Sequence, residues 1–156
     1  MREPRGTLLI VDDDPVIRAS MHVCLTEIGY KVRLAKDGLD ALIAISEEAP
    51  DILLTDLNMP RMSGFELLAH LHTQFPGVQT IGMSGTFCGD EVPSGVLADA
   101  FYQKGSTIGA LLRIIENLPS HSPQNAKRAT QLAPLWVLEA NNGQMDPARP
   151  KGNCPA

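Results

Sequence analysis

The sequence predicts an α/β fold with a five-stranded parallel sheet and helices on both faces. Short apolar runs alternate along the chain with segments in which apolar residues recur at helical spacing. Five such alternations are typical of right-handed βαβ units. Hydrophobic residues make up 44% of the 156 residues, enough for the core of one domain. The composition changes after Pro119, which separates this domain from a tail.

The first half of the domain is predicted to hold two strands and two helices. Residues 7–11 form an apolar run that ends in three acids and Pro15. Pro15 suits the first turn of a helix and Asp14 suits its N-cap. Apolar residues at helical spacing continue to residue 28, and Gly29 ends the helix. Residues 30–35 alternate as in a second strand, and a second helix follows the turn at residues 37–38 and ends before Pro50.

The second half continues the alternation less regularly. The apolar run 52–54 leads to Asp56, and a helix is predicted from about residue 63 to residue 74. Residues 78–83 and 99–103 are the fourth and fifth strands, and residues 108–118 form the last helix. Between these strands residues 90–97 should hold a helix, but residues 93–95 (Pro-Ser-Gly) weaken it, so we expect it to be short or irregular.

We predict a domain over residues 7–118 and a tail over residues 119–156. The tail is rich in Pro, Asn, Gln, Ser and Ala, and we expect it to be largely disordered or a linker. Only residues 131–140, which include Trp136, are apolar enough to form a short helix or strand.

Composition argues against several classes of protein. A net charge of -5 argues against a nucleic-acid-binding surface, and no apolar run reaches the ~18 residues that a membrane span requires. The three cysteines lack metal-ligand spacing, and His70 and His72 are two residues apart, so they point to different sides of a helix. No signal peptide is recognisable at the N-terminus. We therefore predict a cytoplasmic protein that neither binds DNA directly nor enters a membrane.

Polar residues stand at the predicted carboxyl ends of four strands: Asp12 and Asp13, Asp56, Ser84 and Lys104. In open α/β sheets ligands bind at this edge. Three converging carboxylates repel one another unless a hard cation such as Mg²⁺ neutralises them. A carboxylate can accept a phosphoryl group, whose oxygens a lysine and a hydroxyl would then contact. The pattern favours phosphoryl transfer to Asp56, although solvated loop acids and one surface lysine remain an alternative.

These motifs together resemble the receiver domain of two-component response regulators. The resemblance rests on residues 11–15 (VDDDP), residues 56–60 (DLNMP) with Gly64, residues 84–85 and Lys104, and it covers residues 7 to about 118. It implies a flavodoxin-like (βα)5 fold. It also implies that Asp12, Asp13, Asp56 and the backbone carbonyl of Asn58 bind Mg²⁺. Asp56 would accept a phosphoryl group from a histidine kinase or phosphotransfer protein, and Ser84 and Lys104 would contact that group.

The resemblance implies three further roles, each with a simpler alternative. Phe101 would be a rotamer switch coupled to the hydroxyl residue, or else an ordinary core aromatic. Asn58 and Thr86 would tune the rate of self-dephosphorylation, or else be ordinary loop residues. The fourth and fifth helices with the fifth strand would form a signalling face, through which a homodimer could form.

Two departures from the family pattern affect these expectations. Gly105 follows the lysine where the family usually has a cis proline, and a cis bond without proline costs about 2.5–4 kcal/mol. We therefore predict a trans or strained bond and a shifted loop around Lys104. The stretch from Ser84 to Lys104 is also about two residues short, which makes the signalling face the least transferable part.

Three functions compete at this stage. The first is a phosphoacceptor in a phosphorelay, not an enzyme, that acts by contacts with an unknown output protein. The second is a degenerate receiver that binds partners without phosphorylation. The third is an aspartate-nucleophile phosphatase, because Asp12-x-Asp14 resembles the start of the haloacid dehalogenase motif. That third reading leaves the motif around Asp56 unexplained.

Overall fold

The computed structural model describes residues 3–86 and 95–119. Within these ranges five strands and four helices follow one another along the chain. The strands are β1 (Thr7–Val11), β2 (Lys31–Ala35), β3 (Ile52–Asp56), β4 (Gln79–Ser84) and β5 (Ala100–Gln103). The helices are α1 (Pro15–Ile28), α2 (Gly38–Glu47), α3 (Gly64–Gln74) and α4 (Ile108–Glu116).

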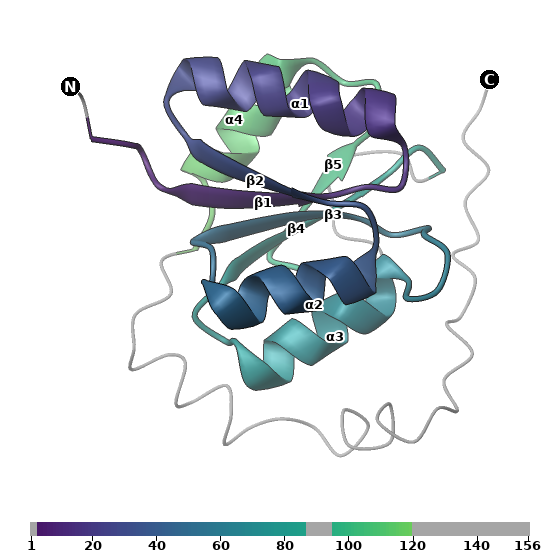
Figure 1. Ribbon diagram of the computed structural model, residues 1–156. Helices are drawn as coiled ribbons and strands as arrows, with labels where there is room; N and C mark the ends of the chain where they lie inside the picture. The colour runs from purple at the N-terminus through teal and green to yellow at the C-terminus, as the bar shows by residue number, and fades with distance from the viewer. Residues whose placement is uncertain (1–2, 87–94, 120–156) are drawn as a thin grey trace.

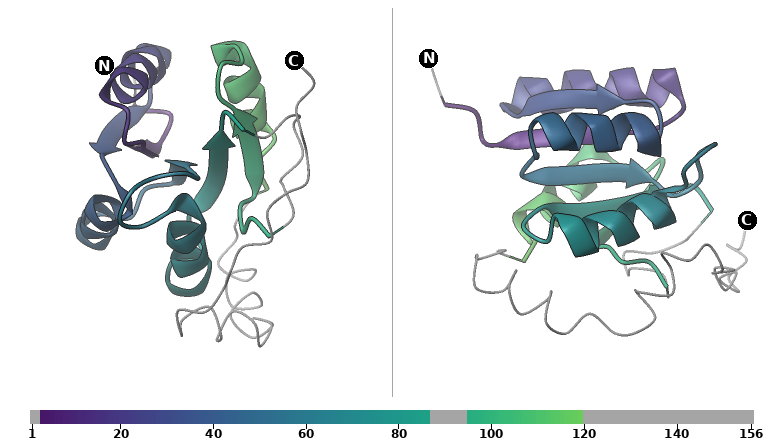
Figure 2. Two further views of the ribbon diagram at one scale, coloured as in Figure 1. Left: turned by 90° about the vertical axis from the view of Figure 1, so that its right-hand side faces the viewer. Right: turned by 60° about the horizontal axis from the view of Figure 1, so that its bottom comes forward.

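The strands form one sheet in the order β2-β1-β3-β4-β5, and every neighbouring pair is parallel. Helices α1 and α4 cover one face of this sheet, and α2 and α3 cover the other (Figure 1). Viewed from the side, the molecule has three layers, with the sheet in the middle (Figure 2). The predicted α/β architecture is therefore confirmed.

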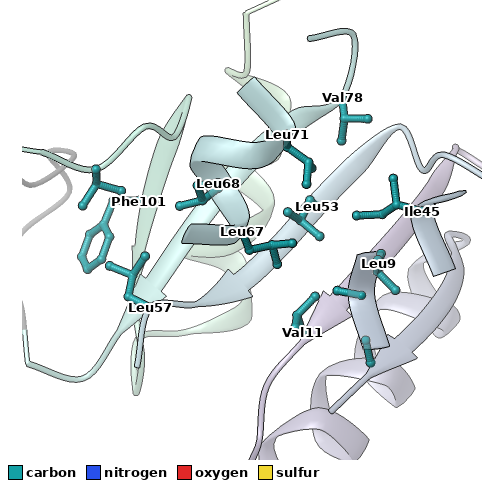
Figure 3. Close-up of a cluster of buried hydrophobic side chains, with 13 residues drawn as sticks. Leu9, Val11, Ile45, Leu53, Leu57, Leu67, Leu68, Leu71, Val78 and Phe101 are labelled. Atoms are coloured by element: carbon teal, nitrogen blue, oxygen red, sulfur yellow. The ribbon is translucent and has the colours of Figure 1, made fainter. Parts of the chain in front are cut away.

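Each strand supplies side chains to both faces because successive residues point in opposite directions. Leu9, Val11 and Leu53 join the core under α2 and α3, which Figure 3 shows in close-up. Leu8, Ile10 and Leu54 join the second core, under α1 and α4. All five residues of the central strand β3 are buried. This explains why β1 and β3 read as continuous apolar runs in the sequence.

The helices begin where a side chain can accept hydrogen bonds from the free N–H groups of the first turn. Asp14 caps α1, with its Oδ1 2.8 Å from the backbone nitrogen of Val16. Ser63 caps α3 in a reciprocal arrangement with Glu66. Asp37 caps α2 and Thr107 caps α4. Each capping residue lies in a loop at the carboxyl end of a strand, so the caps also fix the loops at that edge.

The predicted strands and helices agree with the structure to within two residues at most ends. The exception is the predicted irregular helix at residues 90–97. Residues 90–94 lie outside the described residues, and residues 95–97 are not helical. The tail from residue 120 also lies outside them, so its predicted disorder stays a prediction. Within the described residues no helix is long and apolar enough to cross a membrane.

Candidate functional site

The polar residues predicted from the sequence come together at the carboxyl edge of the sheet, the edge where the carboxyl ends of the strands lie. Asp12 directly follows β1, and Asp56 is the last residue of β3. Ser84 ends the neighbouring strand β4, and Lys104 directly follows β5. Since β1, β3, β4 and β5 are consecutive in the sheet, the four residues stand in a row along one edge.

Lys104 lies between two of the acids. Its Nζ is 2.7 Å from Oδ2 of Asp12 and 3.0 Å from Oδ2 of Asp56. The side chain of Asp12 is fully buried and that of Asp56 is 7% exposed, whereas the lysine side chain is 18% exposed. One ammonium therefore serves two buried carboxylates, and the row carries a net negative charge.

Asp12 is anchored through Oδ1 and its backbone carbonyl, while its other oxygen, Oδ2, faces Lys104. Its Oδ1 accepts a hydrogen bond from the backbone N–H of Asp14 at 2.9 Å. The guanidinium of Arg18 donates to its backbone carbonyl at 2.6 Å. Oδ2 is buried and makes no aligned hydrogen bond, although the Lys104 ammonium lies close to it. A buried carboxylate oxygen in this state retains lone pairs for a further positively charged partner.

Burial makes the ionised form of the Asp56 side chain unfavourable. Burial raises the pKa of Asp56 above its ordinary value, although the Lys104 ammonium and the backbone N–H of Asn58 both act to lower it. That N–H donates to Oδ1 at 3.2 Å. Burial by itself would lower the pKa of Lys104, but the contacts with Asp12 and Asp56 outweigh this, and the pKa of the lysine is raised. The lysine therefore stays protonated at neutral pH.

The acids fit a divalent cation. Asp12, Asp13 and Asp56 can each present one carboxylate oxygen, and these oxygens lie within 4.8 Å of one another. Oδ2 of Asp12, buried beside Lys104 without an aligned hydrogen bond, adds an acceptor to the set. Asp13 is exposed, so the site opens to solvent on one side. An all-oxygen site that leaves room for water suits Mg²⁺, which usually retains several of its waters.

Ser84, Thr86 and Asn58 form a hydrogen-bonded cluster next to the acids. The hydroxyls of Ser84 and Thr86 are 2.7 Å apart, and the backbone N–H of Thr86 donates to Oγ of Ser84 at 3.1 Å. The side-chain amide of Asn58 donates to the same Oγ over a longer 3.4 Å. Ser84 is fully buried, whereas Asn58 and Thr86 are exposed. The three residues singled out in the sequence thus share one hydroxyl group.

Phe101 is buried in the core under α2 and α3, on the side of β5 that faces Leu57 (Figure 3). No peptide bond within the described residues is cis, so the Lys104–Gly105 bond is trans, as predicted. Gly105 has a φ of +91°, a conformation that glycine adopts without a steric penalty. The lysine lies beside both acids, and the predicted shift of its loop relative to other receivers stays a prediction.

Two contacts that support the site were missed from the sequence. An ion pair joins Asp37 to Arg61 across 2.6 Å. A Cβ on Gly64 would lie 2.0 Å from the carbonyl oxygen of Asp56, so the start of α3 packs directly on the backbone of that residue. The motif contains this glycine, but only the spatial arrangement shows what it packs against. The ion pair joins residues 24 apart, and local patterns do not report such pairings.

Comparison with known protein families gives a match over residues 8–102 to the response regulator receiver domain. The chain belongs to this family. Receiver domains are phosphoacceptor modules of two-component signalling, and they bind Mg²⁺ at an acidic pocket. The row of Asp12, Asp56, Ser84 and Lys104 lies at the edge of the sheet where that pocket is expected.

Individual relatives agree with this assignment. Sensor histidine kinase RcsC of Salmonella typhi is 33% identical over 108 residues, which are 67% of this chain and 11% of that protein. Chemotaxis protein CheY4 of Vibrio cholerae has the same fold, with a TM-score of 0.65 at 24% identity over 76% of this chain and all of that one. A chain in the crystal structure of histidine kinase ThkA with response regulator TrrA has a TM-score of 0.66 and 26% identity, covering 73% and 98%.

The curated relatives are much longer than the matching region. This chain spans between 9% and 30% of the lengths of the relatives in the comparison. The match therefore describes the receiver domain and not the additional parts of those proteins.

Proposed function

We propose that this receiver domain accepts a phosphoryl group on Asp56, in a Mg²⁺-dependent reaction, from a histidine kinase or a phosphotransfer protein. The observation that carries the proposal is the bridge from Lys104 to both Asp12 and Asp56 at 2.7 and 3.0 Å. It places a cation beside a buried carboxylate whose charge is otherwise unfavourable there. A phosphoryl group on Asp56 would keep a negative charge within reach of the same ammonium.

The proposed reaction is an in-line displacement at phosphorus. An oxygen of Asp56 forms the new O–P bond while the P–N bond to the donor histidine breaks, and the imidazole nitrogen keeps the electron pair. Lys104 would pair with a phosphoryl oxygen as the group arrives, because its ammonium already lies next to the nucleophile. The hydroxyl of Ser84 would donate a hydrogen bond to another phosphoryl oxygen.

The metal would be held by Asp12, Asp13, Asp56 and the backbone carbonyl of Asn58. When bound, Mg²⁺ would offset the charge that accumulates on the phosphoryl oxygens. The charge balance supports this arrangement, since among residues 3–86 and 95–119 only Lys104 forms an ion pair with Asp12 and Asp56, and Asp13 adds a third carboxylate to the group. Arg18 would contribute indirectly, by fixing the backbone of Asp12.

Asn58 and Thr86 are proposed to tune the lifetime of the phosphoryl group. Both share the Ser84 hydroxyl, so a change at either residue alters how freely that hydroxyl can turn toward the phosphoryl oxygens. Phe101 is the proposed switch residue. Phe101 is buried, which corresponds to the inward position of such a switch. A phenylalanine has no hydroxyl, so it cannot form a hydrogen bond that depends on the position of the Ser84 side chain.

The domain is proposed to act by protein contacts in the cytoplasm, without a catalytic activity of its own beyond self-dephosphorylation. The structural relative that was crystallised with a histidine kinase supports a kinase as partner. The output protein is a second proposed partner. A homodimer through the face that includes β5 and α4 is a further proposal.

The test is phosphorylation of the purified chain by acetyl phosphate, read as an increase in intact mass. Asp56→Ala is compared with Asp51→Ala, because Asp51 is an aspartate that directly precedes β3, at the opposite edge of the sheet. We expect a Mg²⁺-dependent phosphoryl adduct in the wild type and in Asp51→Ala but not in Asp56→Ala. An adduct that survives Asp56→Ala would refute Asp56 as the acceptor. No adduct despite Mg²⁺ binding would favour a receiver that works without phosphorylation.

A further inference from the structure

An ion pair fastens the loop that follows Asp56 to the start of another helix. Nη2 of Arg61, in the loop between β3 and α3, lies 2.6 Å from Oδ2 of Asp37. The Asp37 side chain is only 4% exposed, whereas that of Arg61 is 60% exposed. The other carboxylate oxygen, Oδ1, accepts from the backbone N–H of Asp40 and caps α2. The Asp37 carboxylate thus binds the loop that follows Asp56 and also caps α2.

The pair spans a strand that belongs to the acid site. Asp37 follows β2 and Arg61 follows β3, but these strands are not neighbours, because β1 lies between them. The contact therefore joins the segments that follow the two strands on either side of β1, at the carboxyl edge of the sheet. The backbone N–H of Asp12 donates to the carbonyl of Ala35, the last residue of β2, at 3.2 Å. Asp12 is in this way connected to the end of β2, and the Asp56 loop to the residue that caps α2 shortly after it.

The conformation of the loop depends on this attachment. Arg61 has a φ of +67° and is the only non-glycine residue with positive φ among the described residues. Such a backbone is unfavourable for a long side chain and needs support from its surroundings. The next residue, Met62, packs so closely on Gly38 of α2 that a Cβ there would lie 2.7 Å from its Cγ. The ion pair and this contact hold the same point of the loop.

The other end of the loop is fixed by the backbone. The N–H of Gly64 donates to the carbonyl of Leu57 at 3.1 Å, and the N–H of Leu57 donates to the carbonyl of Met83 at 3.0 Å. Asn58 lies between this fixed base and the attachment at Arg61. Its backbone carbonyl, a proposed metal ligand, therefore depends on both ends of the loop for its direction.

We propose that Asp37 and Arg61 are positioning residues for the metal site, and that their ion pair sets the Mg²⁺ affinity by fixing the loop that carries Asn58. This inference rests on the proposed function, because it assumes that Mg²⁺ binds at Asp12, Asp13 and Asp56. Groups that orient metal ligands from outside the coordination shell typically change metal affinity about 10- to 100-fold when they are removed.

Two substitutions break the pair and keep the local structure. In Arg61→Asn the new side chain is neutral and tolerates positive φ, so the backbone conformation is not penalised. In Asp37→Asn the amide oxygen can still cap α2, because asparagine is a good N-cap residue. Glu48→Gln is the control, since it disrupts the ion pairs of Glu48 with Lys31 and Arg33 at the far end of α2.

The signs of the two effects separate positioning from simple electrostatics. Removing the positive charge of Arg61 would strengthen Mg²⁺ binding by charge alone, and removing the negative charge of Asp37 would weaken it. Loss of positioning weakens binding in both variants. We measure the Kd for Mg²⁺ in the unphosphorylated chain by following amide resonances during titration, together with the thermal midpoint of each variant.

We expect each variant to bind Mg²⁺ about tenfold more weakly than the wild type. The double variant should be no weaker than either single one, because the two residues act through one contact. Glu48→Gln should bind as the wild type does. Tighter binding in Arg61→Asn, or an unchanged Kd with only a lower thermal midpoint, overturns the positioning role. A wild-type chain that binds no Mg²⁺ overturns the proposed function, and this inference with it.

Discussion

The two edges of the sheet use aspartate in opposite ways. At the amino edge, where the strands begin, Asp51 precedes β3 and Asp99 precedes β5. Oδ2 of Asp51 accepts from the backbone N–H of Thr7 at 2.8 Å and from its hydroxyl at 3.0 Å, while that hydroxyl accepts from the N–H of Asp51 at 2.9 Å. Asp99 and Thr80 repeat this arrangement between β5 and β4.

At the carboxyl edge the aspartates are buried more deeply and share one charged donor. Asp12 and Asp56 share the Lys104 ammonium, and each has one backbone N–H donor on Oδ1. Asp51, by contrast, is exposed. Burial without full compensation raises the pKa of Asp56.

The comparison shows that the burial and the partners of an aspartate decide whether it stabilises the fold or is suited to bind a ligand. The amino-edge acids join neighbouring strands and use Oδ2 for hydrogen bonds within the protein. The carboxyl-edge acids are buried together beside one lysine and bear an electrostatic cost that a cation or a phosphoryl transfer would relieve. The four predictions that follow test this contrast.

The largest effect is expected for Gly64→Ala, which disturbs the backbone of the carboxyl edge. A Cβ on Gly64 would lie 2.0 Å from the carbonyl oxygen of Asp56 and 2.7 Å from Cα of Leu57, so the loop or the helix must shift. We expect a loss of about 3 kcal/mol in the free energy of unfolding, measured by urea denaturation. Gly77→Ala is the matched control, because nothing lies within 4 Å of its Cβ position. Equal stability of the two variants would contradict the packing described for Gly64.

The next largest effect is expected for Lys104→Met in the absence of Mg²⁺. The substitution leaves two buried carboxylates without their shared cation, and we expect a loss of about 2 kcal/mol at pH 7. Without the lysine the pKa of Asp56 should rise further, so the variant should regain stability as the pH falls and the carboxyl becomes protonated. Added Mg²⁺ should also restore stability. Lys31→Met removes a cation from an exposed ion pair and should change stability by less than about 0.5 kcal/mol.

The third prediction compares charge removal at the two edges. Burial raises the pKa of Asp56, so its ionised form disfavours folding, and Asp56→Asn should raise the free energy of unfolding at pH 7 without Mg²⁺. The wild type should gain stability as the pH falls through the raised pKa, and the variant should not. Asp51→Asn should instead cost about 1 kcal/mol, because Thr7 loses a charged acceptor. If Asp56→Asn and Asp51→Asn changed the free energy of unfolding in the same direction, the contrast between the two edges would be refuted.

Much of this arrangement is local and was therefore predictable. The periodicity of residues 7–11 and 52–56 gives buried strands, and the acids and turn residues after them give the edge where the site lies. The alternating order of strands and helices then brings Asp12, Asp56, Ser84 and Lys104 into one row. The roles assigned to these residues remain predictions, because geometry alone does not demonstrate phosphorylation.

What could not be predicted depends on contacts between distant residues. Asp37 was assigned to a turn, and nothing in its neighbourhood indicates that it pairs with Arg61. The contacts of Lys104 with Asp12 and Asp56, which lie at the carboxyl ends of other strands, also join residues far apart in the chain. The paired Thr–Asp arrangements at the amino edge likewise join residues that are 44 and 19 apart in the chain.

The smallest effect is expected for Tyr102→Phe, at the end of β5 that leads to Lys104. The Tyr102 hydroxyl donates to the carbonyl of Ser106 at 2.6 Å and so supports the loop after the lysine. Losing this bond should cost about 1 kcal/mol, seen as a lower thermal midpoint. Burial raises the pKa of Tyr102, so the wild-type side chain contributes stability that is lost as the pH rises through that raised value. The difference between wild type and variant should therefore shrink in strongly alkaline solution. Thr80→Val, which removes a hydroxyl near the start of the neighbouring strand β4, should show no such alkaline dependence.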